Sequence, residues 1–258
     1  MKKSIPIINY YLQRGKICGT ITKVILRSTA LIKNLLLDLD DTLLDFKKAE
    51  SIAIRTTFLE FGIDPSDENI ALYSKINRSC WEKLELGEFT RDEVLHKRFD
   101  ILFSHLGITG SAHEMQQLYE YKLSLCAFYL DGARELLDTL FGKYRMYLAT
   151  NGIVNVQTRR LADSGVSKYF DGIYISEKIG YNKPDKRYFD EIFKSIPDFK
   201  HEETVIVGDS LTSDIKGGIN AGIKTIHFNP RKSENKSEII PDYEISSLDE
   251  LPKLLETL

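Results

Sequence analysis

The sequence predicts an α/β fold, a parallel sheet with helices on both faces and an α-helical cap inserted after the first strand. Short apolar segments alternate with helical segments through the second half of the chain, as in parallel sheets. The first such segment, Leu35–Leu37, leads directly into Asp38-Leu39-Asp40. Residues 47–130, which follow it, show helical periodicity and few strand signals, and this predicts the insertion.

Length and composition describe an ordinary globular protein and exclude several classes. The 258 residues are 42% hydrophobic and 28% charged, with a net charge of -3. Nothing here indicates binding to a nucleic-acid polymer or a membrane surface, and no apolar run is long enough to cross a bilayer. Cys18, Cys80 and Cys126 are scattered without metal-binding spacing, which favours reduced thiols and a cytoplasmic protein.

The chain divides into three predicted parts. Residues 1–32 are expected to be a loosely ordered N-terminal extension, and a start codon assigned too far upstream would give the same pattern. A weak export or mitochondrial-type leader is the alternative. Residues 33–46 and 131–258 form the predicted core, and residues 47–130 the predicted cap.

Helices and strands are expected at definite positions in the predicted cap and the predicted core. Glycines and a proline separate the cap helices, and Thr90 with Glu93 resembles a capping box. The expected cap helices are Lys47–Phe61, Asp67–Leu86, Arg91–Leu106 and Ala112–Ala127. The expected core strands are Arg145–Ala149, Gly172–Ile175, Thr204–Val207, Lys224–Phe228 and Tyr243–Ile245, and the core helices are Val154–Ser164, Pro184–Ser195, Ser213–Ala221 and Leu248–Leu255.

Four short polar segments follow predicted strands. They are Asp38-Leu39-Asp40-Asp41-Thr42, Thr150-Asn151-Gly152, Lys183-Pro184-Asp185, and Gly208-Asp209-Ser210 with Asp214 behind it. Ligands bind beyond the carboxyl ends of parallel strands, so these segments are expected to meet there. Period-two alternation along a strand would start Asp38 and Asp40 on the same side, where two carboxylates repel without a cation or a shared proton.

The chemistry of this set indicates phosphoryl transfer. Carboxylate oxygens favour Mg²⁺, which typically keeps water and substrate phosphate among its ligands. Thr150 lies where a strand turns into a helix, a terminus that suits an anion. Lys183 adds a positive charge, and charge neutralisation of this kind is what phosphoryl chemistry requires.

In order and spacing, the four motifs resemble the haloacid dehalogenase (HAD) superfamily, in its phosphatase branch, from Leu35 to Leu258. The resemblance implies a Rossmann-like core with a helical cap, and Mg²⁺ as cofactor. It implies that Asp38 is the nucleophile that forms an aspartyl-phosphate, and that Asp40 is the general acid and then the base. It also implies that Lys183 neutralises the nucleophile and the phosphate.

The same resemblance implies the ligands of the metal and the phosphate. Mg²⁺ would bind the Asp38 carboxylate, the Asp40 backbone carbonyl and the Asp209 carboxylate. Asp214 would hold a metal-bound water or orient Lys183, although capping of the helix after Ser213 is an alternative. Phosphoryl oxygens would be bound by Thr150 and Asn151.

Asp40 and the cap pattern indicate which activity of the superfamily to expect. Dehalogenases of the superfamily lack an acid two residues after the nucleophile, because halide leaves without a proton. The cap and C-terminal pattern, together with Thr150-Asn151-Gly152, resembles the pyrimidine 5'-nucleotidase group: Asn77, Trp81, Leu84, Glu85, Gly87, Thr90, Arg91, Glu93, Arg98, Phe99 and His227-Phe228-Asn229-Pro230. Phe46, Trp81 and Phe89 are candidates for lining a substrate cleft, although large aromatic residues on such helices commonly pack in a core.

Several neighbouring residues have simpler interpretations. Asp41 is expected to cap the following turn, Asp45 to be a solvated loop acid, and Arg231–Glu238 to be a solvated loop. The five histidines need no catalytic role.

The sequence thus predicts a Mg²⁺-dependent phosphomonoester hydrolase that acts on a small phosphate ester, a pyrimidine nucleoside 5'-monophosphate. A sugar-phosphate or phosphoglycolate phosphatase and a phosphomutase are alternatives. A haloacid dehalogenase or a non-catalytic binding protein fits the acid set less well. The protein is expected to be a monomer or a homodimer.

Overall fold

The core of the computed structural model, which describes residues 31–258, is a six-stranded sheet in which every strand pair is parallel. The strand order is β3-β2-β1-β4-β5-β6. The strands are β1 (Asn34–Leu37), β2 (Arg145–Thr150), β3 (Gly172–Ile175), β4 (Thr204–Gly208), β5 (Lys224–Phe228) and β6 (Tyr243–Ile245). The chain runs outward from β1 on one side and outward from β4 on the other, so the order reverses between these two strands. Ligands of open α/β sheets bind at such a point.

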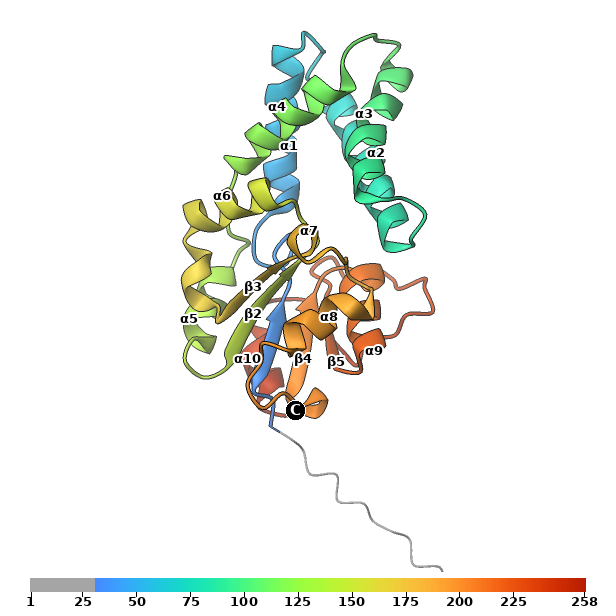
Figure 1. Cartoon of the computed structure of the whole chain (residues 1–258). Coiled ribbons are helices and arrows are strands. Elements are labelled where there is room, and N and C mark those ends of the chain that lie inside the picture. The colour runs from blue at the N-terminus through green and yellow to red at the C-terminus, as the bar shows by residue number, and fades with distance from the viewer. Residues whose placement is uncertain (1–30) are drawn as a thin grey trace, which may run out of the picture.

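Helices cover both faces of the sheet (Figure 1), and side chains alternate between these faces along the buried strands. Leu35 and Leu37 of β1 pack in one apolar cluster, and Leu36 packs in another on the opposite face. The first face is covered by α5 (Ala133–Leu140), α6 (Val154–Ser164) and α10 (Glu250–Leu255), and the second by α8 (Lys186–Phe193) and α9 (Lys216–Ala221). Burial on both faces explains the nearly continuous apolar character of these strands.

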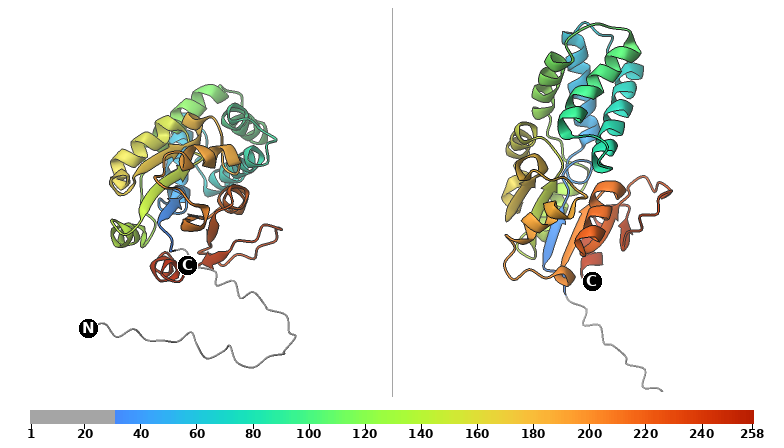
Figure 2. Two further views of the ribbon diagram at one scale, coloured as in Figure 1. Left: turned by 60° about the horizontal axis from the view of Figure 1, so that its bottom comes forward. Right: turned by 45° about the vertical axis from the view of Figure 1, so that its right-hand side comes forward.

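Four helices between β1 and α5, which we call the cap, extend beyond the carboxyl ends of the strands (Figures 1 and 2). They are α1 (Phe46–Glu60), α2 (Asp67–Glu85), α3 (Arg91–Leu106) and α4 (Ala112–Ser124). Each begins at a side-chain N-cap, and α3 has the full capping box of Thr90 and Glu93. An apolar cluster around Phe58, Tyr73 and Phe99 holds them together.

The predicted α/β class is confirmed, and most predicted elements lie within a few residues of their observed ends. The α5 helix was not predicted, nor were the short α7 (Ser176–Ile179) and the 3-10 turns Val166–Tyr169 and His201–Glu203. The helix expected from Pro184 begins at Lys186, because Asp185 is its N-cap. The helix expected over Ser213–Ala221 is divided into a π-helical turn, Leu211–Ile215, and α9.

Several predictions remain outside these observations. The division into extension, core and cap at residues 33, 47 and 131 stays a prediction. Residues 1–30 lie outside the described chain, and so does Cys18, whereas Ile32 is already buried in the core. Cys80 and Cys126 are free and buried. Over residues 31–258, no helix combines the length and hydropathy needed to span a membrane.

Candidate active site

Lys183 lies at the centre of the polar cluster beyond the carboxyl ends of the strands. Its Nζ donates to Asp38 Oδ1 at 2.6 Å, to Asp214 Oδ1 at 2.7 Å and to the Ala149 carbonyl at 2.6 Å. Its side chain is 1% exposed. Burial lowers the pKa of the Lys183 ammonium, but Asp214 and Asp38 outweigh this, and the net effect raises it. The three acceptors therefore hold a charged lysine beside Asp38.

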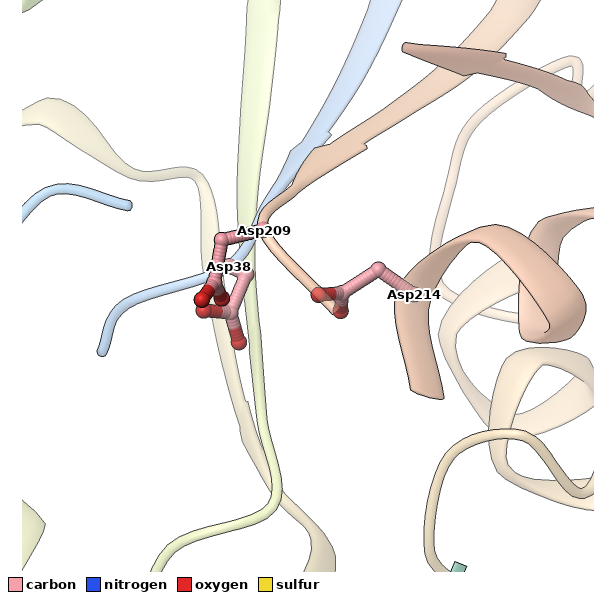
Figure 3. A group of neighbouring side chains, drawn as sticks. All are labelled: Asp38, Asp209 and Asp214. Carbon is pink, nitrogen blue, oxygen red and sulfur yellow. The ribbon is translucent and has the colours of Figure 1, made fainter. Parts of the chain in front are cut away.

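Three acids meet at the point where the strand order reverses. Asp38 follows β1 and Asp209 follows β4, and Figure 3 shows both carboxylates with Asp214 directed toward them from the side. One carboxylate oxygen from each of the three lies within 4.8 Å of the others. The adjacent strands β1 and β4, which are far apart in the chain, bring these residues together at the edge of the sheet where the sequence predicts that they meet.

The acid cluster carries more negative charge than Lys183 can balance. Burial is the main cause that raises the pKa of the Asp38 carboxyl to about 7, against the opposing effect of Lys183. Burial, with Asp38 and Asp214 nearby, raises the pKa of the Asp209 carboxyl well above its usual range. A cation between Asp38 and Asp209 would restore their ionised forms.

The donor set fits a hard divalent cation. Asp38 and Asp209 offer carboxylate oxygens, the ligands that Mg²⁺ prefers, and no thiol or imidazole from the described part of the chain belongs to the cluster. No ion-pair partner contacts Asp209 within residues 31–258. These two side chains could therefore hold Mg²⁺, with the Asp40 carbonyl as the third ligand that the sequence predicts.

Asp214 is positioned by contacts that differ from helix capping. Its Oδ1 accepts from Lys183 and its Oδ2 accepts from the Ser210 backbone N–H at 3.1 Å. The N-cap of the π-helical turn is Ser210, whose hydroxyl accepts from Ser213 N at 3.2 Å. A Cβ at Gly208 would collide with the Asp214 carboxylate, so glycine at that position leaves room for it. The capping alternative is wrong, and the geometry favours the orientation of Lys183.

The Thr150-Asn151-Gly152 segment, here called the Thr150 loop, connects β2 to α6 and is hydrogen-bonded to the loop that carries Lys183. The Asn151 side chain donates to the Lys183 carbonyl and accepts from the Lys183 backbone N–H, each at 2.9 Å. The Thr150 hydroxyl oxygen accepts from Gly152 N at 3.2 Å. Asn151 therefore fixes the backbone that carries Lys183, and the role of both residues in phosphate binding stays a prediction.

Asp40 has different partners from Asp38. Strand pairing in β1 ends at Leu37, so the two acids do not continue a common strand face. The Asp40 carboxylate accepts from Arg160 at 2.5 Å and from Gln157 at 2.6 Å, both on α6. Neither residue is recognisable from the sequence, because a polar residue on an amphipathic helix carries no signal of what it contacts.

A cavity of about 600 Å³ connects the acid cluster to the cap. Phe46 and Trp81 line it, as predicted, whereas Phe89 is absent from its wall and packs instead beneath Lys83 and Lys97. The cap adds polar side chains to the wall, and so does the loop after β5, whose residues 231–238 are exposed, as expected of a solvated loop. These further lining residues include Glu50, Ser74, Asn77, Arg98, Arg231, Ser233, Glu234 and Asn235.

Two cap residues reach the catalytic core directly. Arg91, the first residue of α3, donates to the Asn151 and Gly152 carbonyls at 3.1 and 3.0 Å. It also donates to Ser176 Oγ at 2.6 Å. Glu85, the last residue of α2, accepts a hydrogen bond from the Thr212 hydroxyl. The sequence pattern marked both residues, but it did not indicate that they connect the cap to the core.

Two further acids, Asp41 and Asp45, lie where the chain enters the cap. Asp41, with φ at 59°, accepts from Lys47 N at 3.2 Å, in agreement with a local capping role. Asp45 is the N-cap of α1 and accepts from Lys48 N at 2.9 Å. The expectation that Asp45 is a free loop acid is therefore wrong, because the helix begins directly after it.

Comparison with known proteins agrees with this arrangement. The family model of haloacid dehalogenase-like hydrolases matches residues 35–228. The chain belongs to the haloacid dehalogenase-like hydrolase family. It is an enzyme of that family, a phosphatase-type hydrolase.

Two bacterial relatives of this HAD hydrolase cover most of the chain. HAD-hydrolase YfnB of Bacillus subtilis is 42% identical over 86% of this chain and 95% of its own length. Pyrimidine 5'-nucleotidase PynA of Streptococcus pneumoniae is 41% identical over 87% of this chain and 95% of its own. A magnesium-bound crystal structure of YfnB, described as revealing interdomain movement, superposes with a TM-score of 0.83 over 87% of this chain and 98% of that chain.

The L-2-haloacid dehalogenase of Xanthobacter autotrophicus shares the fold alone, with a TM-score of 0.71 at 14% identity over 88% of this chain and 99% of its own.

Proposed function

We propose that this HAD hydrolase is a Mg²⁺-dependent phosphomonoester hydrolase that acts through an aspartyl-phosphate. The observation that carries the proposal is the Lys183 ammonium held between Asp38 and Asp214, with Asp209 alongside. A phosphate dianion approaching Asp38 would be repelled unless positive charge is already in place. Lys183 supplies one such charge, and the acid cluster fits the divalent ion that would supply the rest.

Asp38 and Asp40 have separate roles in this proposal. The Asp38 carboxylate attacks phosphorus and forms the covalent intermediate, while Lys183 balances its charge. Asp40 gives a proton to the leaving oxygen and later takes one from the water that hydrolyses the intermediate. Bound Mg²⁺ would neutralise negative charge on the phosphoryl group. The presence of Asp40 favours esters over haloacids, because an alkoxide requires a proton to leave.

We further propose a pyrimidine nucleoside 5'-monophosphate as the substrate. The name of PynA, at 41% identity, supports a nucleotide. The cavity of about 600 Å³ suits a small-molecule ligand, and Phe46 and Trp81 offer aromatic surface beside the buried polar groups of the cap. A cytoplasmic location and a monomeric or homodimeric state stay predictions.

A panel of phosphate esters, assayed for released phosphate with and without Mg²⁺, tests both parts. The expected result is Mg²⁺-dependent hydrolysis, with kcat/KM for dUMP, UMP or dTMP above that for sugar phosphates and phosphoglycolate. Preference for the latter would overturn the nucleotide assignment but leave the phosphatase. Isomerised phosphosugar instead of inorganic phosphate would indicate a mutase, and no activity on any ester would overturn the catalytic proposal.

A further inference from the structure

Two side chains on one face of α6 hold the Asp40 carboxylate by both of its oxygens. Arg160 Nη1 donates to Asp40 Oδ1 at 2.5 Å, and Gln157 Nε2 donates to Asp40 Oδ2 at 2.6 Å. Residues three apart on a helix lie side by side. Arg160 Nη1 also donates to Gln157 Oε1 at 2.9 Å, so the pair orient each other. We call Gln157 and Arg160 the clamp.

The burial of Arg160 is difficult to explain by stability alone. Its side chain is 0% exposed, and within residues 31–258 Asp40 is its only acidic partner. Nε donates to the Cys126 carbonyl at 2.9 Å, while Nη2 finds no hydrogen-bond partner among residues 31–258. A buried ion pair is often no more stabilising than apolar residues of similar size, and an unsatisfied buried donor costs free energy. What the arrangement provides is a fixed orientation of Asp40.

The clamp is also hydrogen-bonded to the Thr150 loop. Gln157 Nε2 donates to Thr150 Oγ1 at 3.1 Å as well as to Asp40. A Cβ at Gly152 would collide with the Gln157 side chain, so the glycine of this loop leaves the space that Gln157 occupies. One amide thus relates the position of Asp40 to the loop expected to bind the phosphoryl oxygens.

We propose that Gln157 and Arg160 are positioning residues, which aim the Asp40 carboxyl at the leaving oxygen of the substrate. This inference rests on the proposed function, because a fixed orientation of Asp40 matters for catalysis only if that residue transfers a proton. Proton transfer requires a heavy-atom approach of hydrogen-bond length. An Asp40 side chain free to rotate would seldom meet that requirement.

Dependence on the leaving group tests the clamp directly. Wild type, Gln157→Leu, Arg160→Met, Arg160→Lys and Asp40→Asn would be compared on dUMP and on p-nitrophenyl phosphate with Mg²⁺. The nucleoside leaves as an alkoxide and needs a proton, whereas p-nitrophenolate leaves readily without one. The comparison uses kcat/KM, which reports steps up to the departure of the leaving group. Arg159→Gln is the matched control, since Arg159 is the neighbouring α6 arginine and pairs with Asp163 at the surface.

Loss of positioning should follow the pattern of Asp40→Asn. We expect kcat/KM for dUMP to fall about 100-fold in Gln157→Leu and Arg160→Met, against less than about tenfold for p-nitrophenyl phosphate. Arg160→Lys should recover part of the loss, and Arg159→Gln should behave as wild type. In the Asp40→Asn background, Arg160→Met should cause little further loss on dUMP.

Equal losses on the two esters, or a further large loss in the double variant, would overturn the proposal and leave Arg160 a purely structural residue. If Arg160→Met fails to fold, Gln157→Leu decides, because it removes the hydrogen bonds of the amide to Asp40, Thr150 and Arg160 and keeps the Arg160–Asp40 ion pair. A wild-type protein that hydrolyses neither ester would instead show that the proposed function has failed.

Discussion

The Lys183 ammonium lies 2.6 Å from the Asp38 carboxylate, although the two residues are separated by 145 positions in the chain. Asp38 follows β1, and Lys183 approaches from the loop before α8, so the contact forms only when the sheet has assembled. Asp214 takes a second hydrogen bond from the same ammonium. This pair of contacts connects the stability of the site to its chemistry.

Replacing Lys183 by Met should lower both the stability of the protein and its catalytic activity. Breaking a buried ion pair by removal of one partner costs about 3–5 kcal/mol, because the acids are left uncompensated. Urea unfolding should therefore show a loss of about 3 kcal/mol without Mg²⁺ and a smaller loss with it. We also expect kcat/KM to fall at least about 100-fold. Lys186→Met is the control, since Lys186 pairs with Asp190 at the surface; unchanged stability in Lys183→Met would contradict the assignment.

Asp38→Asn should abolish turnover, because an amide cannot form the acyl-phosphate. A loss of at least about 10⁴-fold in kcat is expected, the order seen when a nucleophile is removed. Mass spectrometry of acid-quenched wild-type enzyme should detect an aspartyl-phosphate on a peptide that contains Asp38. Wild-type turnover in the variant would exclude Asp38 as the nucleophile.

Removal of the metal should also abolish turnover. Treatment with EDTA is expected to eliminate hydrolysis, and excess Mg²⁺ to restore it, because the acid cluster otherwise opposes the substrate dianion. Asp209→Asn should weaken Mg²⁺ binding, measured by calorimetry, by about 100-fold or more. Asp190→Asn, at the surface, is the control. Metal affinity unaffected by Asp209→Asn would place the cation elsewhere.

Arg91→Ala should remove hydrogen bonds between the cap and the Thr150 loop. Its hydrogen bonds to the Asn151 and Gly152 carbonyls are donated by a charged group and cross from the cap to the core. Their loss should lower kcat/KM about tenfold. Arg55→Ala is the control, because Arg55 bonds to Pro65 and Asp67 within the cap. Equal kinetics in the two variants would show that the Arg91 contacts are unnecessary.

Glu85 should make stability depend on pH. Burial is the main cause that raises its pKa to about 7, Asp214 and Glu82 raise it further, and Thr212 and Lys183 oppose them. The folded chain therefore binds a proton on Glu85 that the unfolded chain releases near its ordinary value of 4.5, so this contribution to stability is lost as pH rises toward and through 7.

Glu85→Gln lacks that titration. The Tm of Glu85→Gln minus the Tm of wild type should therefore be more positive at pH 8 than at pH 5, by thermal unfolding. Glu88→Gln, at an exposed cap position, should show no such change. A difference that is independent of pH would mean that Glu85 is not held in a site unfavourable to its charge.

The sequence by itself determined the sheet, the helical insertion and the set of reactive groups. Strands buried on both faces are nearly continuous apolar runs, and helices repeat their apolar positions every three to four residues, so both patterns are local. Asp38, Lys183 and Asp209 were recognisable because each directly follows a strand or precedes a helix, in an order that resembles a family.

The tertiary structure alone decided which side chains face the reactive groups. Gln157 and Arg160 are separated from Asp40 by 117 and 120 positions, and Arg91 is 60 positions from Asn151. In the sequence, nothing distinguishes Arg160 from its neighbour Arg159. In the structure, Arg160 is fully buried against Asp40, whereas Arg159 is half exposed. Helical periodicity shows which face of a helix is polar, but it carries no information about what that face meets. Only the tertiary contact between α6 and the loop after β1 places the clamp beside Asp40.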